Sequence, residues 1–320
     1  MRGFRDYVGG VSMTKVNPGM TVDVEYTEST SFRDYVALAK MGIVRANLLL
    51  VFAGFFVAAT YQSDTPVLYL FEVWPQLLLT MLGSALVISG SCYLNNFVDR
   101  DIDYLMDRTD NRPSVTGKIS GEKILLLGLT QLAIGTLLLL LVSYVAAVFG
   151  LIGAFFYVVI YTMWLKRTST LNTVVGSISG AVPPLIGWAA IDPNLYIDAW
   201  LMFLVMFLWQ PPHFLALAMR RTEEYRAAGI PMLPVVNGFA ITKRQIIWWI
   251  ATLIPASLLF MHYGLVYLTV AAGLGGYWLY LGLKGFKAED EIKWANKMFF
   301  YSLIYLVVWI IALILTAALA

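Results

Sequence analysis

Acidic and amide side chains at the end of one long apolar run are the residues most able to do chemistry. The segment at 95–103 reads NNFVDRDID. If the helix continues through it, Asn95, Asp99 and Asp103 recur at every fourth position and share one face, and Asp107 extends that stripe. Like charges at this spacing repel by about 0.2–0.5 kcal/mol per pair, so the stripe needs a cation. Because all the ligands are oxygen atoms, the sequence predicts a Mg²⁺ site.

Basic residues accompany this acidic stripe. Arg108 and Arg112 follow it four residues apart, and Lys166-Arg167 closes another apolar run. Guanidinium and ammonium groups of this kind bind phosphate beside a metal ion. The alternative is a solvated loop whose acids and bases pair with each other. We favour a binding site, because a second polar cluster is expected on the same side.

That second cluster lies toward the end of the apolar run at 198–218, which contains WQPPH at 209–213. His213 lies inside the run, where an ionisable group indicates function by default, although a hydrogen-bonded structural histidine is the alternative. Pro211 and Pro212 predict a kink that frees backbone carbonyl groups toward a cavity. Arg220, Arg221, Glu223 and Glu224 follow.

The composition shows which elements must position these residues. Hydrophobic residues make up 59% of the 320, charged residues 13%, and the mean hydropathy is +0.73. These values are typical of polytopic membrane proteins. A net charge of +2 gives no electrostatic case for nucleic acid. One cysteine, Cys92, and two histidines exclude a disulfide framework and a metal site built from Cys or His.

The spacing of apolar runs predicts an all-α protein with nine transmembrane helices around a central cavity that opens to the cytoplasm. Under this count all 22 Lys and Arg fall on one side, which predicts a bacterial inner-membrane protein with a cytoplasmic N-terminus and the C-terminus opposite. Residues 1–41 form a polar tail, in which Ser31 is expected to cap a short surface helix, and 42–320 form one domain. The predicted spans are about 43–61, 75–97, 123–142, 145–165, 171–191, 198–218, 246–261, 263–283 and 298–320.

Metal-binding acids and phosphate-binding bases at the mouth of an apolar bundle favour one kind of substrate. A polyprenyl diphosphate has a diphosphate for the rim and an apolar chain for the interior. Mg²⁺ would make the diphosphate a leaving group. Apolar walls would shield the allylic cation from water until an electron-rich second substrate captures it.

At these residues the sequence resembles the UbiA-type intramembrane prenyltransferases. Their first motif, Asn-Asp-x-x-Asp-x-x-x-Asp followed by Arg-Thr-x-x-Arg-Pro, corresponds here to Asn95-Asn96-x-x-Asp99-x-x-x-Asp103 and Arg108-Thr109-x-x-Arg112-Pro113. The sequence departs from the motif at Asn96, where many members have Asp. The resemblance implies nine transmembrane helices around a central cavity, and it covers about residues 40–320.

Within that family the sequence looks most like the branch that prenylates protohaem. The segments NNFVDRDIDYLMDRTDNRP, LKRTSTLNTVVGSISGAVPPLIGWAA and WQPPHFLALAMRRTEEYRAAGIPMLPVV carry this likeness. It implies Mg²⁺-dependent transfer of farnesyl from farnesyl diphosphate to a vinyl group of protohaem IX, with addition of water, which gives haem O. A haem A synthase or a terminal oxidase assembly protein is an expected partner.

The resemblance also assigns expected roles. Mg²⁺ is bound by Asn95, Asp99 and Asp103, and a second Mg²⁺ by Glu223 and Glu224. Asp99, Asp103 and His213 are the catalytic candidates, with His213 as haem contact or proton carrier. Diphosphate or haem propionates are bound by Asn95, Asn96, Arg108, Arg112, Lys166, Arg167, Arg220 and Arg221. The alternatives are a quinone-pathway aromatic prenyltransferase, which usually carries a second Asp-x-x-x-Asp motif, and, more distantly, a transporter.

Overall fold

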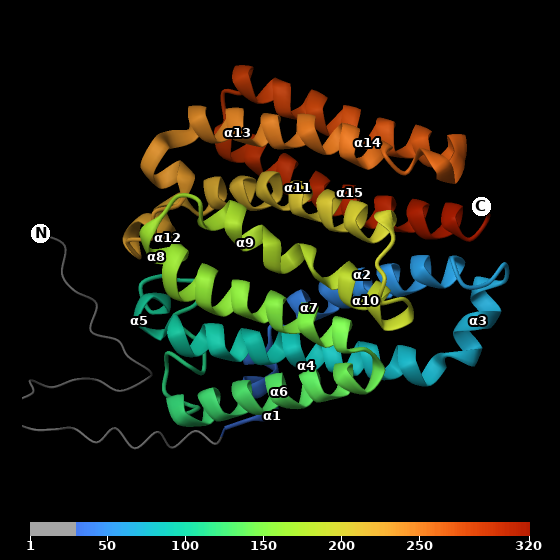
Figure 1. The fold of residues 1–320 in the computed structure, drawn as a ribbon. Coiled ribbons are helices and arrows are strands. Elements are labelled where there is room, and N and C mark those ends of the chain that lie inside the picture. Colours follow the sequence, from blue (N-terminus) through green and yellow to red (C-terminus); the bar gives the residue numbers. More distant parts are fainter. Residues whose placement is uncertain (1–29) are drawn as a thin grey trace, which may run out of the picture.

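Helices follow one another with short connections, and no strand occurs among residues 30–320, the part of the chain that this computed structural model describes. Residues 1–29, and with them most of the predicted tail, lie outside the described residues. The long helices run side by side, as Figure 1 shows, and the all-α prediction is confirmed. The helices are α1 (Phe32–Ala39), α2 (Met41–Thr60), α3 (Pro66–Glu72), α4 (Trp74–Val98), α5 (Arg100–Asp103), α6 (Gly121–Val142), α7 (Tyr144–Phe155), η1 (Phe156–Leu165), α8 (Lys166–Thr168), α9 (Asn172–Ala181), α10 (Pro183–Ile191), α11 (Ile197–Arg220), α12 (Thr222–Ala227), α13 (Leu233–Leu258), η2 (Met261–Tyr263), α14 (Gly264–Lys284), η3 (Gly285–Lys287) and α15 (Glu291–Ala317).

Eight helical segments within 30–320 are long and apolar enough to cross a membrane, so the chain is a multi-pass membrane protein. They match eight of the nine predicted spans. The remaining prediction, 246–261, lies in α13, whose first half carries Lys243 and Arg244 and which is not among the eight. The count of nine therefore stays a prediction. The eight segments are Met41–Thr60, Trp74–Val98, Gly121–Val142, Tyr144–Thr168, Asn172–Ile191, Ile197–Arg220, Met261–Lys287 and Glu291–Ala317.

Local chemistry sets where several helices begin. The backbone N–H and the hydroxyl of Ser31 both donate to the Asp34 carboxylate at 2.9 Å, so the helix predicted after Ser31 is confirmed. These bonds hold the pKa of Asp34 below its usual range. Ser143 separates α6 from α7 and accepts a bond from the N–H of Ala146. Through Pro211 and Pro212, by contrast, α11 continues without a break.

Small residues let the helices approach closely, as is usual where lipid surrounds a bundle. A Cβ atom at Gly187 of α10 would lie 1.9 Å from the carbonyl oxygen of Val51 in α2, and one at Gly54 would lie 2.0 Å from the carbonyl oxygen of Pro184. Glycine is therefore required at both positions, where α2 and α10 are in backbone contact.

The fourth span contains a ten-residue π-helix, η1, which the sequence did not predict. Such wide turns are rare in proteins and are frequent at functional sites. This segment carries Tyr157, Tyr161 and Thr162, all of which take part in the site described below.

The charged segments gather at one end of the bundle. In Figure 1, α5, α8 and α12 lie at the left end, while α3 and the C-terminus lie at the right end. The segregation of charge that the sequence predicted therefore places the acidic stripe, Lys166-Arg167 and the second cluster near one another.

Candidate functional site

A cavity of about 730 Å³ is lined by residues of α1, α2, α4, α7, η1, α9, α10, α11, α12 and α15. Much of its wall is apolar, with Ile186, Met206 and Leu306 among the lining residues. The charged lining residues come from the α4–α5 region, the loop that follows it, the start of α2 and the end of the fourth span. The polar and charged lining residues include Lys40, Asn95, Asp99, Asp103, Arg108, Arg112, Tyr157, Tyr161, Lys166, Gln210, His213 and Tyr225.

Asp99 is a fully enclosed acid of the site, and like Asp103 it has 1% of its surface exposed. Its Oδ2 atom accepts bonds from Asn95 Nδ2 at 2.8 Å and from Lys166 Nζ at 2.5 Å. Its Oδ1 atom is buried and has no hydrogen-bond partner among the described residues, and Arg167 lies 3.9 Å from it. One carboxylate oxygen therefore accepts two hydrogen bonds, while the other has a lone pair to offer.

Asn95 is oriented by the π-helix. Its Nδ2 atom also donates to the hydroxyl of Thr162 at 2.9 Å, and that hydroxyl donates to the carbonyl of Tyr157 at 2.7 Å. The wide turn of η1 thus aims Thr162 at α4. The amide oxygen of Asn95 is left to face Lys40, whose Nζ donates to it.

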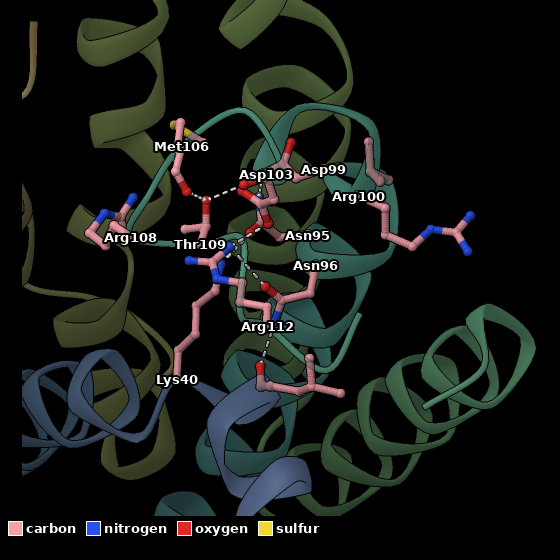
Figure 2. A network of polar contacts seen from close by, with 12 residues as sticks. Lys40, Asn95, Asn96, Asp99, Arg100, Asp103, Met106, Arg108, Thr109 and Arg112 are labelled. Carbon is pink, nitrogen blue, oxygen red and sulfur yellow. Dashed lines mark hydrogen bonds and ion pairs between the residues drawn. The ribbon is translucent and has the colours of Figure 1, made fainter. Parts of the chain in front are cut away.

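Asp103 forms a second ion pair, which Figure 2 shows. Arg112 lies 2.5 Å from Asp103 Oδ2 and donates to Asn96 Oδ1 at 3.2 Å. Asn96 in turn donates to the carbonyl of Leu38 at 2.8 Å and so ties α1 to α4. Asn96 does not line the cavity, so its place in the structure is to hold Arg112 and α1.

The structure places three residues in the stripe, and the prediction that Asp107 extends it is wrong. The helical pattern continues from Asn95 through Asp99 to Asp103, with backbone bonds of 2.9 and 2.8 Å. The hydroxyl of Thr109 then donates to the Asp103 carbonyl at 2.7 Å, which takes the acceptor that another helical turn would need. The chain turns there, and Asp107 is exposed.

The second predicted metal site is not assembled in this structure. Glu223 is exposed and pairs with Arg226, so the structure does not bring it to the cavity. Glu224 pairs with Arg221 at 2.5 Å and lies 3.9 Å from Arg108. The physical reason is that α11 ends at Arg220. In the short helix α12 that follows, Glu224 pairs with the N-cap residue Arg221 and Glu223 pairs with Arg226, each at a spacing of three residues.

Three predicted phosphate-binding arginines also lie outside the cavity lining. Arg167 donates to both oxygens of Asp101, at 2.6 and 2.7 Å, which holds the pKa of Asp101 below its usual range. Arg220 stacks over Phe299 at 4.5 Å, and Arg221 pairs with Glu224. Of the predicted substrate-binding residues, the cavity is reached by Asn95, Arg108, Arg112 and Lys166, and not by Asn96, Arg167, Arg220 and Arg221.

His213 lines the cavity from α11 and is firmly held. Its ring stacks between Trp209 and Phe299, with centroid distances of 4.7 and 4.8 Å. Its Nδ1 atom lies 2.6 Å from the hydroxyl oxygen of Ser302 on α15. The predicted functional histidine is thus placed in the same cavity as Asp99.

Lys40 is a cavity residue that the sequence reasoning missed. It joins α1 to α2 with φ 51°, an uncommon conformation for a residue other than glycine. Burial lowers the pKa of Lys40 to about 8. In the sequence, Lys40 is a lysine just ahead of an apolar run. Lysines commonly flank membrane spans, so this position did not distinguish it as a cavity residue.

Tyr157 and Tyr161 were missed as well. They stack on each other with ring centroids 6.0 Å apart and an interplanar angle of 14°, and both line the cavity. No sequence signal would have found them, because aromatic residues in an apolar run are ordinary and the π-helix that aligns them is not visible in the sequence.

The donor atoms of the site fit Mg²⁺. Asn95, Asp99 and Asp103 offer only oxygen atoms, and Asp99 Oδ1 is a buried acceptor without a donor. No group of three His, Cys, Asp or Glu side chains gathers within the described residues. The protein alone therefore builds no closed cage, and Mg²⁺ normally binds through one or two carboxylates together with phosphate and water.

Sequence comparison supports the resemblance seen in the motifs. The model of the UbiA prenyltransferase family matches residues 47–304. A protein of Exiguobacterium sibiricum named protoheme IX farnesyltransferase is 68% identical over 310 residues, which cover 95% of this chain and 100% of that protein. A protein of Bacillus subtilis named protoheme IX farnesyltransferase 2 is 48% identical over 293 residues, which cover 92% and 95%.

Solved structures share the fold. One, from a study of digeranylgeranylglyceryl phosphate synthase in membranes, has a TM-score of 0.72 and 18% identity, covering 90% of this chain and 99% of that one. A UbiA homologue from Archaeoglobus fulgidus bound to GPP and Mg²⁺ has a TM-score of 0.66 and 15% identity, covering 88% and 99%. Because the family model spans most of the sequence and near-full-length relatives are about half identical or more, this chain belongs to the UbiA prenyltransferase family.

Proposed function

We propose that this chain is a Mg²⁺-dependent protohaem IX farnesyltransferase that makes haem O. The observation that carries the proposal is the buried Asp99, paired with Lys166 through one carboxylate oxygen, at the charged end of a largely apolar cavity. The printed names of relatives that are 68% and 55% identical, over almost the whole chain, support the choice of substrates.

The charged end of the cavity would hold the diphosphate of farnesyl diphosphate. Four cationic side chains line it, and three of them, Arg108, Arg112 and Lys166, already form ion pairs with acids. Asn95, Asp99 and Asp103 would hold Mg²⁺, which supplies charge neutralisation for the leaving diphosphate when it is bound. The cations available to phosphate oxygens are Lys40, Arg108, Arg112 and Lys166.

The walls would protect the farnesyl cation after the C–O bond to diphosphate breaks. Tyr157 and Tyr161 present stacked aromatic rings, and a cation over such a ring is stabilised by about 0.5–2 kcal/mol. Apolar lining residues exclude water from the chain of the donor. The farnesyl cation would therefore react with the second substrate and not with water.

The transfer step balances without a redox partner. The first carbon of farnesyl bonds to the terminal vinyl carbon of protohaem, and the vinyl π electrons form that bond. Positive charge then lies on the carbon next to the porphyrin ring, which delocalises it. Water adds at that carbon and loses a proton, so the products are haem O, diphosphate and a proton. His213 is the candidate to contact haem or to carry that proton.

We also propose which membrane the protein spans and which end of the bundle faces the cytoplasm. The chain lies in the bacterial cell membrane, with the charged end, the start of α2 and the mouth of the cavity on the cytoplasmic side, and the C-terminus on the other. The collection of charged segments at one end of the bundle supports this orientation, as does the segregation of Lys and Arg that the nine-span count predicts. A downstream haem A synthase or oxidase assembly partner stays a prediction.

A product assay tests the proposal. Purified protein in detergent receives protohaem, farnesyl diphosphate and Mg²⁺, and the extracted haem is analysed by mass spectrometry. A haem that has gained one farnesyl group and one water is the expected product. Unchanged haem together with farnesylated 4-hydroxybenzoate, in a parallel reaction, would instead identify an aromatic prenyltransferase.

A further inference from the structure

Neighbouring side chains contact both faces of the His213 ring and its Nδ1 atom. Its Nε2 atom remains without a hydrogen-bond partner among the described residues. Trp209 covers one face with an interplanar angle of 18°, and Phe299 covers the other with an angle of 27°. The Nδ1 atom faces Ser302 at 2.6 Å. No hydrogen bond to Nε2 is formed by any residue among 30–320. Phe214 also lies edge-on to the ring, with centroids 5.0 Å apart. Because His213 lines the cavity and its Nε2 atom has no partner in this part of the chain, we infer that the Nε2 edge faces the cavity.

Ser302 determines which nitrogen of His213 carries the proton. The hydroxyl oxygen of Ser302 lies 2.5 Å from the carbonyl oxygen of Phe299. Two oxygens at this separation require a proton between them, and the carbonyl has none to give. A hydroxyl carries one proton and can still accept, so Ser302 accepts from Nδ1–H of His213.

This chain of hydrogen bonds makes Nε2 a lone-pair donor. A neutral imidazole with its proton on Nδ1 has an unprotonated Nε2, which can bind a metal ion or accept a proton but cannot give one. The backbone supports the arrangement, because Trp209 Nε1 donates to the carbonyl of Ser302 at 2.9 Å and fixes α15 against α11.

We propose that Nε2 of His213 is an axial ligand of the iron of the protohaem substrate, and that Ser302 is the positioning residue that sets its tautomer. The inference rests on the proposed function. Neutral imidazole nitrogen is a common ligand of haem iron, and ligating histidines usually donate their other N–H to an acceptor such as Ser302 provides. An axial bond would hold the porphyrin against α11, while α4 holds the prenyl donor in the same cavity.

The chain supplies a matched control. His262 is the other histidine of the sequence, and it lies in η2, near the end of the bundle opposite the acidic stripe. Its Nε2 atom is 2.9 Å from Asp198, nearly half of its side chain is exposed, and it does not line the cavity. Substitution of His262 therefore removes an imidazole without touching the proposed ligand.

Absorption and resonance Raman spectra of the protein with protohaem, without farnesyl diphosphate, test the proposal. We expect the wild type and His262→Ala to give the spectrum of imidazole-ligated haem. His213→Ala should lose that spectrum and regain it when imidazole is added. Ser302→Ala should weaken haem binding by about 10- to 100-fold and lower the frequency of the ferrous iron–imidazole stretch, because the ligand loses its hydrogen-bond acceptor.

Two results would overturn the proposal. A His213→Ala spectrum identical to that of the wild type would exclude ligation, even if turnover were lost. An unchanged affinity and stretching frequency in Ser302→Ala would exclude the positioning role. Thermal unfolding and retained binding of farnesyl diphosphate show that each variant is folded. The product assay keeps the two proposals apart. If the wild type makes haem O but its haem spectrum is the same as that of His213→Ala, only the ligation proposal is contradicted.

Discussion

The Nζ atom of Lys166 lies 2.5 Å from Oδ2 of Asp99, and both side chains are buried. The pair leaves no net charge in the apolar surroundings, while Oδ1 of Asp99 keeps an unused lone pair. Under the proposed function, the carboxylate would bind a metal ion and the same ammonium group would turn to a phosphate oxygen. The ion pair therefore holds both groups in place without leaving an unpaired buried charge. Burying an unpaired ion costs several kcal/mol, and removing one partner of a buried pair destabilises a protein by about 3–5 kcal/mol.

Asp99→Asn should lower turnover by about 100-fold or more, because it removes a carboxylate from the proposed metal site, and metal stabilisation of a leaving group is worth several kcal/mol. The rate of haem O formation at saturating substrate measures the loss. The amide keeps the size of the side chain but leaves the buried Lys166 without its carboxylate partner, so thermal unfolding in detergent is measured alongside to show that the variant is folded.

Asp101→Asn is the matched control for that variant. Asp101 is two residues away, its side chain is 61% exposed, and it pairs with Arg167 outside the cavity lining. Its turnover should stay within about twofold of wild type, since exposed pairs contribute about 0–1 kcal/mol. Equal losses in the two variants would contradict the assignment of Asp99.

Excess EDTA should stop the reaction, and Mg²⁺ added beyond the chelator should restore it. The reason is that Asn95, Asp99 and Asp103 offer only oxygen, which suits a hard cation completed by diphosphate. Titration of the rate against calculated unbound Mg²⁺ measures the dependence. Full activity in the presence of excess chelator would contradict the assignment of a metal site.

The value of kcat/KM for farnesyl diphosphate should fall as the pH rises through about 8. Burial lowers the pKa of Lys40 to about 8, so its side chain is charged below that pH and neutral above it. Loss of a charge-assisted bond to phosphate costs about 1.5–3 kcal/mol, which corresponds to a fall of about tenfold or more. Initial rates between pH 6.5 and 9.5 give the profile, an interval chosen to span about 1.5 units on either side of the transition.

Two variants show whether Lys40 causes that transition. Lys40→Arg stays charged throughout, so its profile should show no fall near pH 8. Lys40→Met is neutral throughout and should be low and flat. A fall near pH 8 that persists in Lys40→Met would assign the transition to another group.

Gly187→Ala should destabilise the bundle by about 1–3 kcal/mol, the usual cost of overpacking. The added methyl group would lie 1.9 Å from the carbonyl of Val51, so α2 and α10 must separate. Gly273→Ala is the control, because nothing lies within 4 Å of its added methyl group and alanine favours a helix. Thermal unfolding in detergent should show a lower midpoint for Gly187→Ala only.

Much of the fold could be predicted because its cause is local. Apolar runs of about 20 residues have one stable solution in a bilayer, since every backbone group must be bonded within the helix. Eight of the predicted spans were confirmed for that reason, and Ser31 and Ser143 mark helix starts as short polar caps do. The seventh span was harder, because α13 mixes an apolar half with Lys243 and Arg244.

The sequence by itself determined the family and the three acidic-stripe residues that enter the cavity, because helical spacing puts every fourth side chain on one face. Only the tertiary structure decided which cations reach them. Lys166 pairs with Asp99 while its neighbour Arg167 turns to Asp101, and Glu223 turns outward to Arg226. Adjacent residues on a helix differ by about 100° in direction, so which of two neighbours faces a cavity depends on how that helix packs against the others. The π-helix that aims Thr162 at Asn95 and the contact of Ser302 with His213 join segments far apart in the chain, and no local pattern records them.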